Sequence, residues 1–427
     1  MSSLTAPSFN AAPAAVPAAG EAREVARWVT RGTPAYRRIS LALFLAGFST
    51  FSLIYAVQPL LPDLAVEFGV TPSQSSLALS LSTGALALAI LLAAALSERV
   101  SRRGLMFASM AGAAALHVAA ALVPGWHAML LLRALEGFVL GGVPAVAMAY
   151  LAEEIDPRAL GSAMGLYVGG TAFGAMMGRL GIGALTEVVS WRTALGTLGF
   201  LDFLAALGFL ALLPASRNFT PKGGQGFRHH RDAWMRHLGH PGLPLLFLMG
   251  FLALGVNVAM FNYLTFRLAA PPYGLGQGAI SAVFVVFLFG AVASSAAGNL
   301  ADRWSRGPVL ILGVLTMGAG VMLTLSTALP AIFGGVVAVT IGFFMTHSVA
   351  SGWVGRMATG AKGHAASLYL LSYYLGSSVV GSAGGWFWSR AGWPGVVGFA
   401  LTMVLLALLA AIRLLRLGQT EARRRAA

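Results

Sequence analysis

Long apolar runs dominate the chain after residue 38. A helix needs about 20 consecutive apolar residues to cross the hydrocarbon of a bilayer. On that basis the sequence predicts twelve spans, at 40–62, 76–97, 104–124, 128–151, 162–187, 192–213, 243–267, 277–298, 308–327, 329–353, 364–389 and 394–415. Short breaks rich in glycine and proline separate several of the runs. We therefore expect an all-α membrane protein with twelve transmembrane helices.

The composition supports a lipid environment. Hydrophobic residues make up 57% of the chain and charged residues 10%, against about 25% charged residues in soluble domains. We therefore expect membrane lipid as a partner. Cysteine is absent, which excludes disulfides, zinc–thiolate sites and cysteine nucleophiles. No metal site and no cofactor are predicted.

The net charge of +14 has a topological explanation. Of the 28 Lys and Arg residues, five lie inside spans or at one face, and these are Arg133, Arg179, Arg192, Arg267 and Arg390. The remaining 23 fall on the other face, which the positive-inside rule identifies as cytoplasmic. We expect both termini in the cytoplasm and no nucleic-acid partner.

Polar stretches divide the chain into five parts. The expected parts are a disordered N-terminal tail at 1–38, a six-helix bundle at 39–213, a cytoplasmic linker at 214–242, a second six-helix bundle at 243–416 and a basic tail at 417–427. Part of the linker, FRHHRDAWMRHLGH, is basic and aromatic. It fits either a helix along the membrane surface or a solvated connection.

An internal repeat relates the two bundles. The loop ALSERVSRRG (95–104) matches NLADRWSRG (299–307) at an offset of 204 residues. GSAMGLYVGGTAFG (161–174) matches GHAASLYLLSYYLG (363–376) at an offset of 202, and Trp191 and Trp393 continue that match. Parallel repeats of six spans are typical of one class of secondary transporter.

These segments resemble motifs of the major facilitator superfamily. GNLADRWSR (298–306) resembles the family's loop signature, RALEG (133–137) its fourth-span motif, and YAVQPLLPDLAVEFGV (55–70) the first-span end of bacterial drug exporters. Gly165, Gly174, Gly178 and Gly183 resemble the antiporter motif, although Arg179 stands where that motif has proline. The resemblance is closest to a bacterial branch linked to dye and drug export, and implies an inner-membrane location.

The resemblance implies a conformational latch in the two matching loops. Its acidic and basic residues would hold helix ends together in one state of the transport cycle, since carboxylates pair with guanidinium groups and with helix N-termini. The residues expected to form this latch are Glu98, Arg99, Arg102, Asp302, Arg303 and Arg306.

Ionisable residues inside spans are costly and are therefore candidates for function. At 1.5 Å per residue, Arg133, Glu136 and Arg179 share one depth band, so we expect them to form a single Arg–Glu–Arg cluster. Asp202 and His347 are alternative proton carriers, and His117 is expected to be structural. Aromatic and amide side chains suggest a solute pocket formed by Tyr55, Gln58, Asn257, Asn262, Tyr263, Tyr369 and Tyr373.

The sequence therefore predicts a monomeric secondary transporter that exports a small organic or drug-like molecule in exchange for protons. Uptake or exchange of a small organic anion remains the alternative, because the spans carry two arginines. No Walker A sequence and no paired-histidine motif is found. The sequence therefore indicates neither an ATP-driven pump nor an enzyme.

Overall fold

A computed structural model describes residues 28–96, 100–218 and 226–426. The described chain is helical almost throughout. In chain order the elements are α1 (Pro34–Tyr55), α2 (Leu61–Phe68), α3 (Pro72–Ser75), α4 (Leu77–Leu96), α5 (Arg102–Leu122), α6 (Trp126–Leu140), α7 (Pro144–Glu154), α8 (Pro157–Thr186), α9 (Trp191–Leu212), α10 (Phe227–Leu238), α11 (Leu243–Ala269), α12 (Gln277–Ala282), the 3₁₀ segment η1 (Val283–Val286), α13 (Phe287–Trp304), α14 (Arg306–Leu323), α15 (Leu329–Met357) and α16 (Lys362–Ala426).

Nine helical stretches of the described chain are long and apolar enough to cross a membrane. One of them, 362–420, runs through non-helical backbone at Ala391 and Gly392 and so joins two predicted spans. The helix α8 and the pair α6 and α7 occupy the other predicted spans but are not among the nine. The count of twelve spans therefore stays a prediction.

The span predicted at 128–151 is two helices rather than one. The backbone turns between Leu140 and Pro144, where α6 ends and α7 begins. Pro144 has no N–H to donate and is favoured in the first turn of a helix. Apolar length alone predicts an uninterrupted helix here, and the glycines at 141 and 142 followed by proline interrupt it.

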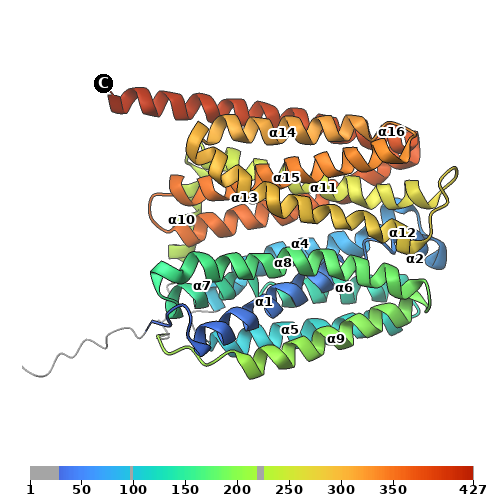
Figure 1. Cartoon of the computed structure of the whole chain (residues 1–427), viewed down its shortest axis with the longest axis horizontal. Coiled ribbons are helices and arrows are strands. Elements are labelled where there is room, and N and C mark those ends of the chain that lie inside the picture. The colour runs from blue at the N-terminus through green and yellow to red at the C-terminus, as the bar shows by residue number, and fades with distance from the viewer. Residues whose placement is uncertain (1–27, 97–99, 219–225, 427) are drawn as a thin grey trace, which may run out of the picture.

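Each half of the described chain packs largely on itself (Figure 1). Helices α1 and α4–α9 pack mainly on one another, and α11 and α13–α16 do the same. The linker helix α10 lies against the start of α16, where His230 Nδ1 and His364 Nε2 are 2.9 Å apart. Contacts between the two groups run chiefly from α16 to α3 and α4, from α11 to α2, and from α8 to α12.

One helix crossing occurs in both groups. A Cβ added at Gly174 of α8 would collide with the backbone carbonyl of Phe48 in α1, and one at Gly376 of α16 would collide with that of Phe251 in α11. Phe251 and Gly376 lie 203 and 202 residues after Phe48 and Gly174. Glycine permits this close backbone approach, so the internal repeat extends to the packing of the helices.

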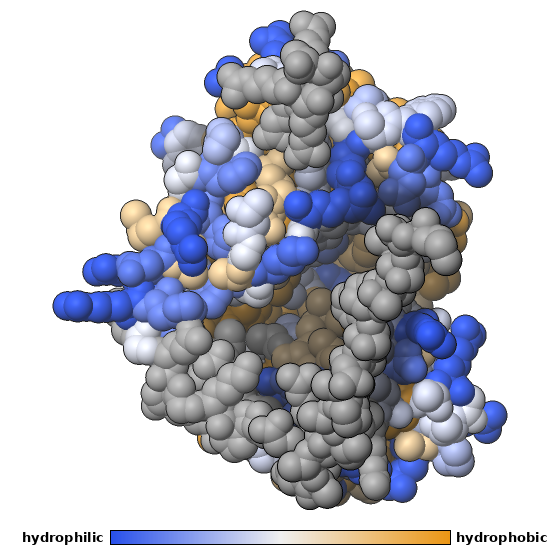
Figure 2. Space-filling view, turned by 90° about the vertical axis from the view of Figure 1, so that its left-hand side faces the viewer, coloured by the Kyte–Doolittle hydropathy of each residue, from blue (hydrophilic) through white to orange (hydrophobic). Residues whose placement is uncertain are grey.

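The two ends of the molecule differ. One end, called here the termini end, carries the C-terminus, α10 and the turn from α7 to α8, and the opposite far end carries α2 and α12 (Figure 1). Seen end-on, the termini end has hydrophilic residues around a hollow whose deeper surface is hydrophobic (Figure 2).

Candidate functional site

Hydrogen bonds join the two helix groups at the far end. The hydroxyls of Ser80 in α4 and Ser382 in α16 are 2.6 Å apart. The Tyr263 hydroxyl of α11 donates to Ser76 at 3.2 Å. Gln277 of α12 donates to Asp63 of α2 at 2.8 Å, and burial raises the pKa of the Asp63 carboxyl above its ordinary value. These contacts close the interface between the two groups at the far end.

A second connection lies beside these bonds. Gln58, in the turn after α1, donates from Nε2 to Asn262 Oδ1 of α11 at 2.7 Å. Gln58 Oε1 accepts from Arg179 Nε of α8 at 2.7 Å. The two amide residues are 204 residues apart, which is the offset of the internal repeat. They therefore meet where equivalent parts of the two groups face each other.

Arg179 is buried in an aromatic box. Its guanidinium carbon lies 4.2 Å from the ring centre of Tyr55 and 4.8 Å from those of Phe284 and Phe287. Tyr55 belongs to the first group, whereas the two phenylalanines belong to η1 and α13 of the second. Each desolvated cation–π contact stabilises the buried cation by about 2 kcal/mol. Moving an ion from water into the protein interior costs several kcal/mol. The three rings together therefore offset a substantial part of the burial cost.

A separate network surrounds Glu136. Arg133 Nη1 donates to Glu136 Oε2 at 2.7 Å, and His117 Nδ1 of α5 lies 3.0 Å from Glu136 Oε1. All three residues are at most 1% exposed. His117, which we expected to be structural, is thus in direct contact with the carboxylate, and its Nε2 has no partner among the described residues.

Arg133 also binds the backbone of neighbouring helices. It donates to the carbonyls of Leu53 at 3.2 Å and Ile54 at 2.7 Å, near the end of α1, and to that of Ala78 in α4 at 3.0 Å. The last carbonyls of a helix lack intrahelical partners. Arg133 therefore caps α1 while it pairs with Glu136.

The expected three-membered cluster is therefore two networks. Arg133 and Glu136 pair as predicted from their spacing, but Arg179 contacts Gln58 and the carbonyl of Ala175 instead. The depth of a residue in the membrane does not determine in which direction around the helix axis its side chain points. For this reason the prediction of a single cluster was wrong.

Asp202 of α9 lies close to the Glu136 network. It is 2% exposed and faces the hydroxyls of Ser49 and Ser52 in α1. Its Oδ2 has no hydrogen-bond partner among the described residues. Asp202 and Glu136 are near enough to interact electrostatically. Two carboxyl groups and one histidine thus lie together inside the first helix group.

An aromatic wall occupies the second group. His347 Nδ1 of α15 lies 2.9 Å from the Tyr369 hydroxyl of α16, and the rings of His347 and Tyr373 are 4.5 Å apart. His347 and Tyr373 are partly exposed. Tyr55, below Arg179, is near enough to Tyr373 to interact electrostatically. The wall therefore continues to the aromatic box.

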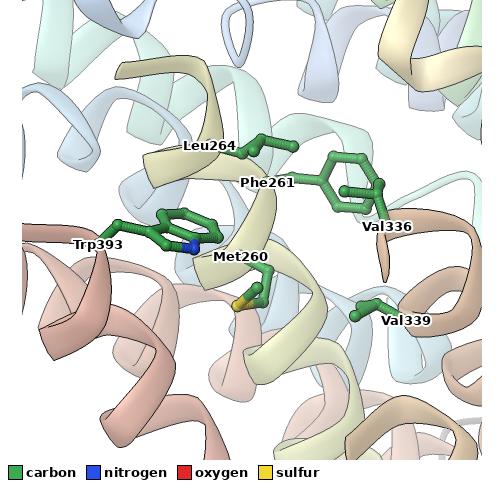
Figure 3. A pocket seen from close by; sticks show the side chains of 6 residues that line it. All are labelled: Met260, Phe261, Leu264, Val336, Val339 and Trp393. Carbon is green, nitrogen blue, oxygen red and sulfur yellow. The ribbon is translucent and has the colours of Figure 1, made fainter. Parts of the chain in front are cut away.

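The remaining predicted pocket residue, Asn257, is buried in α11 with its amide nitrogen unpartnered among the described residues. A narrow gap nearby, too small to admit a water molecule, is lined by apolar side chains of α11, α15 and α16 (Figure 3). Phe261 lines this gap and also stacks on Phe284, with ring centres 5.2 Å apart. Ligand sites place a few polar groups to orient the ligand, so this gap is packing space behind the aromatic box.

The predicted latch is only partly described. Glu98 and Arg99 lie outside the described residues. Asp302 lies 3.7 Å from Arg306 and 3.6 Å from Arg356 of α15, and Arg303 is exposed without entering these pairs.

In the first group, Arg102 pairs with Glu153 at the end of α7, with Nε to Oε2 at 2.6 Å. The sequence did not predict Glu153 as the partner of Arg102 or Arg356 as a partner of Asp302. It also missed the rings of Phe284 and Phe287, because no spacing rule links such distant positions.

Comparison with known proteins gives consistent results. The profile described as Major Facilitator Superfamily matches residues 43–296 and 269–427. The MFS-type transporter YybF of Bacillus subtilis is 44% identical over 89% of this chain and 94% of its own length. The inner membrane transport protein YnfM of Escherichia coli is 42% identical over 91% of this chain and 93% of its own length.

Solved structures share the fold at low identity. A bacterial homologue of the human lysosomal transporter Spinster, in an inward-facing and occupied conformation, gives a TM-score of 0.72 at 14% identity, covering 91% of this chain and 98% of that one. The nucleoside transporter NupG gives a TM-score of 0.71 at 14% identity, covering 88% of this chain and 99% of that one.

Proposed function

Because the chain belongs to the major facilitator superfamily and is a membrane transporter, we propose that it exports a small organic molecule in exchange for protons by alternating access. In this proposal twelve spans form two groups of six, and the two groups rock about a central site. The protein works as a monomer in the bacterial inner membrane, with both termini in the cytoplasm.

The observation that carries the proposal is the unequal closure of the two ends. The far end is joined by hydrogen bonds such as Ser80–Ser382 and Gln58–Asn262, while the termini end is hollowed (Figure 2). Alternating access requires two such states of opposite closure. With cytoplasmic termini, the described state is inward-facing.

Protons would use the buried groups of the first helix group. Glu136, His117 and Asp202 are ionisable, and two of them carry unpartnered polar atoms among the described residues. Arg133 holds Glu136 in place through a 2.7 Å bond. A shift of α1 relative to α6 within the first helix group, accompanying the rocking, would alter the carbonyl contacts of Arg133 and so its hold on Glu136. Proton uptake would thereby be linked to the conformational state.

The solute would occupy the space between Tyr55, Arg179 and the wall of His347 and Tyr373. These side chains come from both helix groups, as a midplane site requires. Their aromatic rings suit a solute with an apolar or aromatic body. Uptake or exchange of an organic anion stays the second candidate, favoured by the guanidinium of Arg179.

Direction and coupling are tested by transport of a metabolite and drug panel in intact cells and in inverted vesicles. Proton-coupled export predicts solute accumulation in acidified inverted vesicles and its loss when the proton gradient is collapsed. Accumulation by intact cells would favour uptake instead.

The role of Glu136 is tested in the same vesicles. Glu136→Gln should abolish gradient-driven transport but spare counterflow, which needs no net proton movement. Normal gradient-driven transport by Glu136→Gln would exclude Glu136 as the proton site.

A further inference from the structure

Two arginines are fully buried in the first helix group, and they differ in how their charge is balanced. Arg133 forms an ion pair with Glu136. Arg179 is 2% exposed and forms no ion pair with any residue that the structure describes. Buried charges are normally paired, because removing them from water is costly. The guanidinium of Arg179 therefore has capacity for an anion.

The internal repeat shows that helix packing does not require this charge. Asn262 follows Gln58 by 204 residues, and Gly381 follows Arg179 by 202. Arg179 donates to Gln58, and in the second group Asn262 donates to the carbonyl of Gly381 at 3.5 Å. The two contacts are counterparts, but the second group has glycine at the position of the arginine. Arg179 is therefore an addition to the shared architecture.

The rings that cover Arg179 are placed where the helix is irregular. Phe284 lies within the 3₁₀ segment η1, and Phe287 begins α13 directly after it. A 3₁₀ stretch inside a helix often marks a hinge. Phe284 packs against Phe261 and Leu264 of α11. Displacement of the rings therefore requires this irregular segment to move.

We propose that Arg179 binds the carboxylate of an organic anion and that this carboxylate displaces the rings of Phe284 and Phe287. This inference rests on the proposed transport function and names its solute class. A carboxylate accepts paired hydrogen bonds from a guanidinium, which aromatic faces cannot do. Because the rings belong to the second helix group, their displacement loosens the closed far end. Tyr55 and Tyr373 contact the apolar or aromatic body of the solute.

The test uses ligand-induced thermal stabilisation of the purified full-length protein. The probes are phenylacetate and indole-3-acetate, their neutral amides, and the cation phenethylamine. Only the two carboxylates should stabilise the native protein. Arg179→Gln should weaken their binding roughly tenfold or more, the size of a lost charge-assisted hydrogen bond, and Arg179→Lys should retain part of it. Arg192→Gln is the matched control, because Arg192 lies at the far end but outside the aromatic box. This variant should bind the two carboxylates as the native protein does.

A second variant tests displacement without removing the charge. Phe284→Leu takes away a competing ring and should tighten phenylacetate binding by up to about thirtyfold, the value of one desolvated cation–π contact. Equal stabilisation of the native protein by acids and amides, no stabilisation by either acid, or unchanged binding in Arg179→Gln would overturn the proposal. Weaker binding by Phe284→Leu would exclude displacement.

The two proposals fail in different ways. Selective carboxylate binding without any transport in vesicles would count against the proposed function alone. Transport of neutral solutes that is unaffected by Arg179→Gln would count against the anion site alone.

Discussion

The network around Arg133 permits a quantitative prediction about stability. Arg133 neutralises Glu136 and binds three carbonyls of α1 and α4. Arg133→Met leaves a buried carboxylate without its cation, which should lower the free energy of unfolding by about 3–5 kcal/mol. Glu136→Gln keeps an acceptor for Arg133 and should cost less, about 1.5–3 kcal/mol.

The double variant separates pairing from simple loss of packing. Because the two side chains contact each other, Arg133→Met with Glu136→Gln should cost less than the sum of the single changes, by about 0.5–3 kcal/mol. Equilibrium unfolding in mixed micelles measures all three variants. Glu67→Gln is the matched control, since Glu67 pairs with Arg192 at the surface, and it should cost at most about 1 kcal/mol. Additive single effects, or an Arg133→Met variant as stable as the control, would refute the reasoning.

Three further predictions concern other parts of the chain. Asp302→Asn should slow counterflow but leave equilibrium solute binding nearly unchanged, because the exposed pairs of Asp302 lie at the termini end; a large loss of binding with normal counterflow would contradict this. Reporter fusions at Arg228 and after Ala427 should be active only in cytoplasmic format, and periplasmic activity at either site would reverse the topology. Tyr369→Phe removes the hydroxyl 2.9 Å from His347 and should weaken solute binding about fivefold, whereas unchanged affinity would place the solute elsewhere.

Features that depend on local sequence were predicted well. Family membership was correctly predicted from the loop motif at 298–306, and the match to the family covers residues 43–296 and 269–427. The pairing of Arg133 with Glu136 followed from three-residue spacing on one helix face. The 202-residue offset aligned Gly174 with Gly376, and in the structure both glycines lie at equivalent helix crossings.

Features that depend on how helices rotate and meet were not predictable. Depth along α8 placed Arg179 near Glu136, but its direction around the helix axis sends it to Gln58 and the aromatic box. Asp302 pairs with Arg356, 54 residues away, and only the fold brings them together. Composition likewise gave no sign that His117 contacts Glu136.

The central claim is that the contacts at the far end must open during transport, and one engineered crosslink tests it directly. The chain has no cysteine, and the hydroxyls of Ser80 and Ser382 are 2.6 Å apart. The double variant Ser80→Cys, Ser382→Cys can therefore form a disulfide across the closed end without competing thiols. The control is Ser190→Cys, Thr193→Cys, whose hydroxyls are 3.0 Å apart within the first helix group.

The measurement is vesicle transport of a solute identified in the panel, before and after oxidation and again after reduction. Alternating access predicts that oxidation abolishes transport only in the Ser80–Ser382 variant and that reduction restores it. Full transport by the crosslinked protein would contradict the account.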